Sequence, residues 1–125
     1  MHANFHNEIL FVGRFLMGGA FVFAGLRNIQ NMAFLAQMMG ARGVPQAATV
    51  LWLGIVAQIV AGVLLMVGFW TAPAAALLLL FLLAATPMFH NFWDHQGPDR
   101  AAKINGFVGN IALAGGFLTL LSVAQ

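Results

Sequence analysis

Arg14 is a charged side chain inside the first long apolar stretch of this sequence. A guanidinium in hydrocarbon costs at least about 2.5 kcal/mol on insertion scales, so such a residue is expected to face other helices and to serve a function. Gly18 and Gly25 lie near its helical face and would let another helix approach closely. We therefore predict that Arg14 contacts a ligand or a specific buried partner. The alternative is that it extends to the membrane surface or binds backbone carbonyls.

Two amide side chains, Gln58 and Asn110, lie inside later apolar stretches. Gln58 is four residues from Gly54 and from Gly62, and Asn110 follows Gly106 at the same spacing, so each amide shares a helical face with small residues. Such faces are typical of helix packing, with Gln58 as an interhelical hydrogen-bond donor and Asn110 in the same role. The alternative is contact with a ligand, and in that case the amides and the buried arginine would line one polar cluster or path.

An aromatic segment that carries histidine follows the third apolar stretch. Pro87 removes a helical hydrogen bond, so we expect the helix to bend or loosen there. His90 and Asp94 are four residues apart and can hydrogen-bond to each other, and with Trp93 they form a rim suited to a quinone or a lipid head group. The alternative is an anchor of amphipathic rings at the membrane interface. We predict no metal site, because His90, Asp94 and His95 match no established ligand spacing.

The composition places these residues in a membrane protein. Hydrophobic residues make up 62% of the 125 residues and charged residues only 6%, whereas a soluble domain has about 25% charged residues. This excludes a soluble globule, a disordered tail and a nucleic-acid binder. The sequence has no cysteine, which excludes disulfides, iron–sulfur clusters and covalently attached haem. Redox chemistry would therefore need a quinone, another bound cofactor or a partner subunit.

The apolar stretches predict an all-α fold. A membrane helix needs about 20 apolar residues, and four stretches meet that length: 9–29, 47–69, 72–89 and 104–123. We predict a polytopic four-helix transmembrane bundle that forms a single domain over residues 1–125. Apolar residues at helical spacing between residues 31 and 42 predict a short amphipathic helix at the interface between the first two spans, or alternatively a short buried helix.

Lysine and arginine predict the orientation of this bundle. The two loops that share a side, 30–46 and 90–103, lie beside or contain Arg27, Arg42, Arg100 and Lys103, whereas the two termini and the turn at 68–71 carry no Lys or Arg. Because cytoplasmic loops are enriched in these residues, we predict a multi-pass protein of the plasma (inner) membrane. Both loops would be cytoplasmic and both termini outside.

Several motifs occur in a particular order along the chain. They are Gly13-Arg14-Phe15-Leu16 with Ala24-Gly25-Leu26-Arg27, then residues 62–69, Phe89-His90-Asn91-Phe92-Trp93, and residues 103–116. This ordered set resembles the DoxX family of small four-helix membrane proteins. The resemblance implies a four-helix bundle and an association with oxidoreductase systems, since the family name comes from a subunit of a thiosulfate- or quinol-oxidising membrane complex. Many members have an acidic residue where Gln58 stands, so a proton-relay role is weakened at that position.

These observations lead to one main functional hypothesis. It is a redox-associated membrane subunit that binds a quinone or a lipid-like molecule between its helices, with Arg14, Gln58, His90, Trp93 and Asn110 as ligand-contacting residues. The expected partners are the lipid bilayer and either a partner redox subunit or further copies of the chain, with no nucleic acid. The alternatives are a non-catalytic assembly or stability factor for a membrane complex, and a small transporter that prefers anions because its buried charge is an arginine. Whether the protein is an enzyme is left open.

Overall fold

The predicted all-α membrane fold is confirmed. The computed structural model describes residues 3–123, with side chains from residue 5 onward, and contains no strand in that range. The elements in chain order are α1 (Ala3–Gln30), α2 (Met32–Ala41), α3 (Ala47–Val67), α4 (Thr71–Phe89), the short 3-10 turn η1 (Phe92–Asp94) and α5 (Gly97–Val123). The four long helices are long and apolar enough to cross a membrane, and the shorter apolar helix α2 lies between the first two.

The last long helix, α5, extends beyond its predicted apolar span. It begins at Gly97, seven residues before the predicted start at residue 104. Pro98 occupies the first turn, where its missing N–H has no cost, and Asp99 in the same turn interacts favourably with the helix dipole. Apolar length therefore marks the part of a helix that can enter hydrocarbon, whereas capping residues decide where the helix begins.

A tight turn joins α3 to α4, as the short connection at 68–71 predicts. Gly68 has a left-handed φ of 76°, which favours glycine, and its N–H donates to the carbonyl of Leu64. The N–H of Phe69 donates to the same carbonyl at 3.0 Å, so the last turn of α3 is closed by backbone hydrogen bonds. Helices α3 and α4 therefore form an antiparallel hairpin.

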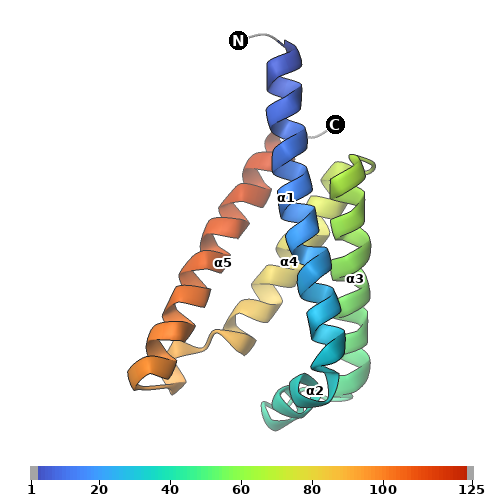
Figure 1. Cartoon of the computed structure of the whole chain (residues 1–125). Helices are drawn as coiled ribbons and strands as arrows, with labels where there is room; N and C mark the ends of the chain where they lie inside the picture. Colours follow the sequence, from blue (N-terminus) through green and yellow to red (C-terminus); the bar gives the residue numbers. More distant parts are fainter. Residues whose placement is uncertain (1–2, 124–125) are drawn as a thin grey trace.

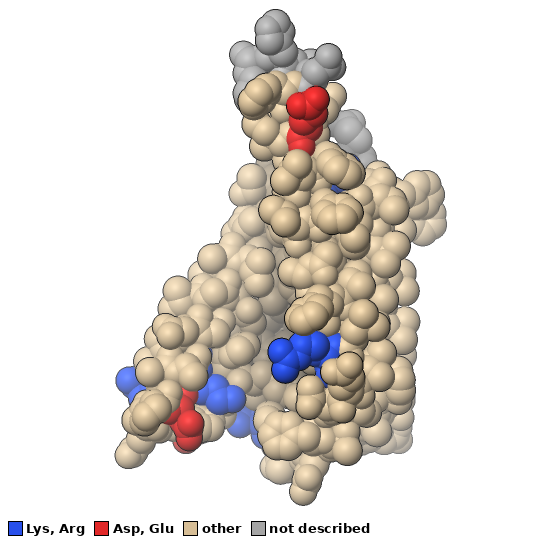
Figure 2. Space-filling view, in the orientation of Figure 1, with Lys and Arg blue, Asp and Glu red and all other residues tan. Residues whose placement is uncertain are grey.

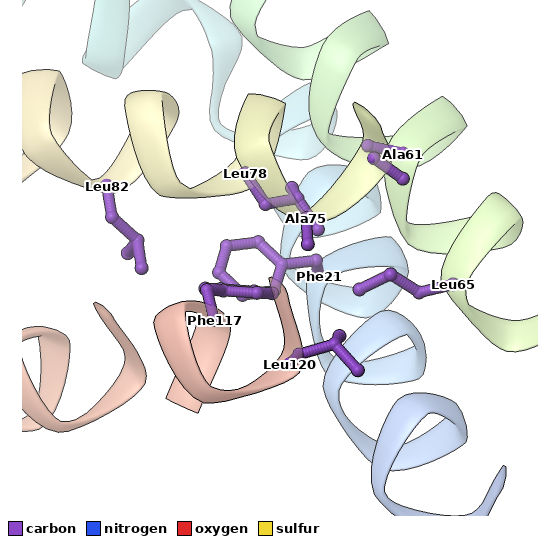
Figure 3. Close-up of a cluster of buried hydrophobic side chains, with 9 residues drawn as sticks. Phe21, Ala61, Leu65, Ala75, Leu78, Leu82, Phe117 and Leu120 are labelled. Carbon is purple, nitrogen blue, oxygen red and sulfur yellow. The ribbon is translucent and has the colours of Figure 1, made fainter. Parts of the chain in front are cut away.

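The hydrophobic core lies in the half of the bundle nearest the termini, where all four long helices meet (Figure 3). Phe21 of α1 and Phe117 of α5 point toward each other there, with ring centroids 5.5 Å apart. Leu65 of α3 and Leu78 of α4 complete the cluster, and each is fully buried. This cluster fixes the helices to one another at one end of the molecule.

The helices separate toward the opposite end (Figure 1). Helix α1 packs along α3, while α4 runs obliquely away from the end of α3 toward the start of α5. Helices α1 and α5 consequently diverge toward the end that carries α2 and η1. Both termini and the α3–α4 turn lie at the closed end. The bundle is therefore tightly packed at one end and splayed at the other.

Basic side chains gather at the splayed end (Figure 2). Arg27 is in the last turn of α1, Arg42 directly follows α2, and Arg100 and Lys103 are in the first turns of α5. The Nη1 of Arg42 lies 3.7 Å from the Oδ2 of Asp94, so an ion pair links the end of α2 to η1. The residues used to predict orientation thus share one end of the molecule.

Candidate functional site

A cavity of about 550 Å³ lies between α1, α3, α4 and α5 in the splayed half of the bundle, with α2 at its end. This volume falls within the range of about 300–1,000 Å³ that is usual for small-molecule sites. Figure 2 shows this face of the molecule hollowed between α1 and α5. A molecule dissolved in the bilayer would therefore meet the cavity from the side of the bundle.

Small side chains create the space. Ala20 and Ala24 of α1, Gly54 of α3, and Ala84 and Ala85 of α4 all line the cavity. Larger residues at these positions would fill the gap left by the diverging helices, since protein interiors otherwise pack to high density. The hollow is therefore a property of both the helix directions and the side-chain sizes.

The lining is mostly apolar and uncharged. Among the described residues that line the cavity there is no Lys, Arg, Asp or Glu, and the polar side chains are Asn28, Gln58, His90 and Asn110. Asn28, Gln58 and Asn110 lie in α1, α3 and α5, and His90 directly follows the last residue of α4. A few polar groups on an apolar wall are typical of a site that orients a neutral ligand by hydrogen bonds.

Gln58 is held by a hydrogen bond across the α1–α3 interface. Its side chain is 3% exposed, and its Oε1 accepts a hydrogen bond from the Nδ2 of Asn28 at 3.1 Å. Gly25 allows this approach, because a Cβ there would lie 3.7 Å from the same Oε1 and only 2.6 Å from a side-chain carbon of Ile59. Gly25 therefore allows the close packing expected of it. Gln58 makes the expected interhelical hydrogen bond, but as the acceptor, so its predicted role as the donor is wrong.

Asn110 is held by α4. Its Nδ2 donates to the Oγ1 of Thr86 at 3.0 Å, and the Thr86 hydroxyl in turn donates to the carbonyl of Leu82 one turn earlier. Thr86 is buried and immediately precedes Pro87, near the end of α4. This chain of bonds fixes the rotation of the Asn110 amide.

His90 caps the end of α4 and packs on α5. Its backbone N–H donates to the carbonyl of Thr86 at 2.9 Å. Its ring lies directly against Gly106, where any Cβ would collide with the imidazole. Nearby, the Nζ of Lys103 donates to the carbonyl of Phe89 at 2.7 Å and ties the start of α5 to the end of α4. Because Gly106 of α5 has no side chain, it leaves room for the imidazole of His90 at the cavity wall.

The predicted hydrogen bond between His90 and Asp94 is wrong. Asp94 instead accepts a hydrogen bond from the Nδ2 of Asn91 at 3.0 Å and pairs with Arg42. The reason is that α4 ends at Phe89, so His90 and Asp94 are not on one continuous helix and their four-residue spacing no longer places them side by side. Neither ring nitrogen of His90 hydrogen-bonds to another described residue.

Arg14 and Trp93 lie outside the cavity. The Nε of Arg14 donates to the carbonyl of Leu65 at 3.3 Å, and its guanidinium lies over Gly68 at the closed end of the bundle. Trp93 is 52% exposed and packs against Phe92 and Phe107. The structure therefore brings together three of the five predicted ligand-contacting residues, Gln58, His90 and Asn110, and separates the other two from them.

Two polar residues of this site were not singled out from the sequence. Asn28 lies at the end of a span, where polar residues are common. Thr86 donates its hydroxyl to a carbonyl of its own helix, which is a common local role for threonine in a helix. The useful signal for Thr86 was its position directly before Pro87, which removes one backbone hydrogen bond of α4. No group of three or more His, Cys, Asp or Glu in the described range is placed to hold a metal ion.

Comparison with known proteins identifies the family. The DoxX family model matches residues 9–91, which is well over half of the chain. The chain is also 26% identical to the inner membrane protein YphA of Escherichia coli (strain K12) over 112 residues, which cover 90% of this chain and 80% of YphA. No solved structure matches. With the four apolar helices described above, these matches mean that the chain is an integral membrane protein of the DoxX family.

Proposed function

We propose that this protein is a redox-associated subunit of the inner membrane that binds a quinone or a lipid-like small molecule in the cavity between its helices. One observation carries the proposal. An apolar space of about 550 Å³ is lined by uncharged polar groups from three helices and from the end of a fourth, among them Gln58, His90 and Asn110. The inner-membrane location is supported by the relative YphA, and the redox association rests on what the resemblance to the DoxX family implies.

The chemistry of the lining favours a neutral ligand with a ring or head group that hydrogen-bonds. An ion would have to leave water for an apolar wall without a countercharge, which is strongly unfavourable. The anion-preferring transporter relied on Arg14 as the binding charge, and Arg14 bonds to Leu65 away from the cavity. The geometry therefore supports binding of a neutral molecule better than ion transport.

The test is a binding titration of the purified protein in lipid nanodiscs. The probes are a decyl-substituted benzoquinone and its quinol, and organic extraction with mass spectrometry would identify any lipid that co-purifies. Ala85 lines the cavity, so Ala85→Phe places a phenyl ring in the ligand's space. We expect this variant to weaken binding of both probes by about five- to 150-fold, because overfilling a site costs on the order of 1–3 kcal/mol.

Ala112→Phe is the matched control, because Ala112 is exposed on α5 and does not line the cavity. It adds the same volume and should leave the affinity unchanged. Failure of the wild-type protein to bind either probe or to carry an extractable lipid would overturn the proposal. So would equal losses in the two phenylalanine variants.

A further inference from the structure

We infer that the cavity selects the hydroxyl-bearing, reduced form of its ring ligand, a quinol, over the corresponding quinone. This inference rests on the proposed function and adds a choice between two redox forms of the same ligand class. It depends on which side-chain atoms of Asn110 and Gln58 have no hydrogen-bond partner within the protein.

The Thr86 hydroxyl determines which end of the Asn110 amide is used. A hydroxyl has one hydrogen, and Thr86 donates it to the carbonyl of Leu82. The Thr86 oxygen can then only accept from Asn110, and it does so from Nδ2 at 3.0 Å. Because only the NH₂ end of an amide can make that bond, one hydrogen of Nδ2 is used, and Oδ1 keeps both of its lone pairs for other partners.

This oxygen is accessible. The Oδ1 of Asn110 has no hydrogen-bond partner among the described residues, and no buried side-chain nitrogen or oxygen in that range lacks a partner. It is therefore not sealed inside the protein, and Asn110 lines the cavity. The Oδ1 of Asn110 is therefore a hydrogen-bond acceptor on the α5 side of the cavity, and a donor group on the ligand would pair with it.

The α3 wall offers the opposite group. The Oε1 of Gln58 already accepts from Asn28, whereas Nε2 has no hydrogen-bond partner among the described residues and keeps both of its hydrogens for a ligand. The same reasoning shows that this nitrogen is accessible although the residue as a whole is 3% exposed. Gln58 therefore presents a donor to the cavity and suits an acceptor on the ligand.

A quinol matches both walls. One of its hydroxyls can donate to Asn110 and the other can accept from Gln58. A quinone carries only acceptors, so one carbonyl oxygen would face the Asn110 Oδ1 with no hydrogen between them or would leave that oxygen unpaired. A site built to hydrogen-bond a hydroxyl discriminates against an analogue that lacks it. His90 suits either form, because a neutral imidazole has one donor and one acceptor nitrogen.

The inference is tested by comparing three ligands on the wild-type protein in nanodiscs. They are the decyl-substituted benzoquinol, the matching benzoquinone, and the dimethyl ether of the quinol. The ether keeps the reduced ring and the tail but cannot donate a hydrogen bond, so it separates hydrogen-bond donation from ring shape. We expect the quinol to bind roughly three- to tenfold more tightly than both other ligands, since one hydrogen bond decides between them.

Variants of α4 and α5 test the cause of this preference. Thr86→Val keeps the shape of the side chain but removes the hydroxyl, so the Asn110 amide is free to turn and offer either end. We expect the ratio of the affinity for the quinol to that for the quinone to fall toward one. Asn110→Leu should also abolish the preference. Asn105→Leu makes the same change at an exposed position of α5 and should preserve the preference.

Each outcome separates the two claims. Equal binding of quinol and quinone, or tighter binding of the quinone, by the wild-type protein would overturn this inference and leave the proposed function standing. A full quinol preference in folded Thr86→Val protein would also overturn it, because Thr86 would then not orient Asn110. Failure of all three ligands to bind would overturn this inference, and it would overturn the proposed function as well if no lipid can be extracted from the purified protein.

Discussion

At the scale of single residues, a charged group inside an apolar span is used here to close a helix end. The Nε of Arg14 donates to the carbonyl of Leu65 in the last turn of α3, and the guanidinium lies over Gly68. The last carbonyls of a helix lack partners within the helix and carry partial negative charge, so they are a suitable place for a cation. One N–H of the Arg14 guanidinium is thereby paired with a carbonyl at the end of α3.

Arg14→Ala should therefore weaken the fold and not the ligand site. We expect a loss of about 1–2 kcal/mol in the free energy of unfolding, because a charge-assisted hydrogen bond and the favourable helix-end interaction are both removed. The measurement is SDS-induced unfolding in mixed micelles. Affinity for the decyl benzoquinol should stay within about twofold of wild type, since the cavity wall does not change.

Arg27→Ala is the control, because it removes an exposed arginine from the same helix. It should lower stability much less than Arg14→Ala. Loss of quinol binding in a folded Arg14→Ala protein would contradict this assignment and return Arg14 to the ligand site.

At the scale of helices, small residues decide which helices approach closely. A Cβ on Gly62 would lie 2.7 Å from the backbone oxygen of Gly18, and a Cβ on Gly18 would collide with the carbonyl of Gly62. Helices α1 and α3 thus cross with their backbones in contact, as small residues allow in membrane helices. The cavity lies beyond this crossing, toward the end that carries α2, where α5 diverges from α1.

Adjacent glycines of α1 provide a matched test. Gly18→Ala should destabilise the protein by about 1–3 kcal/mol, because the added methyl group forces the two backbones apart. Gly19→Ala should be neutral or stabilise by up to about 1 kcal/mol, since nothing lies within 4 Å of its Cβ position and alanine favours a helix. Unfolding in SDS would measure both. Equal effects of the two substitutions would show that α1 and α3 do not cross at Gly18.

At the scale of the whole molecule, charge and packing are arranged along one axis. The end with α2 and η1 carries the basic loops and the cavity, while the other end carries both termini and the hydrophobic core. If basic loops are cytoplasmic, the cavity lies in the inner half of the membrane. A ligand that partitions into the bilayer would then enter from the cytoplasmic leaflet.

The absence of native cysteine makes this orientation simple to test. Phe69→Cys, in the α3–α4 turn, should react with a membrane-impermeant maleimide in intact spheroplasts. Gln96→Cys, between η1 and α5, should react only after the membrane is permeabilised. Both positions are exposed, so accessibility on the protein surface does not distinguish them. The reverse labelling pattern would invert the orientation and move the cavity to the outer leaflet.

The sequence by itself determined the fold class, the number of long helices, the family and the close-packing glycines. These properties depend on local composition: a run of about 20 apolar residues forms a membrane helix whatever its neighbours are. The small-residue faces at Gly18, Gly25 and Gly62 were also predictable, because a helix places every fourth residue on one side.

The site depended on information that local composition does not contain. Whether Gln58, His90 and Asn110 face one space depends on how each helix is rotated and how far α5 diverges from α1, and both follow from packing across the whole bundle. For the same reason, Arg14 bonds to the end of α3 and Asp94 pairs with Arg42. Neither contact is predicted by spacing along the chain. Tertiary structure decided these contacts because they join residues far apart in the sequence, and helix directions bring such residues together.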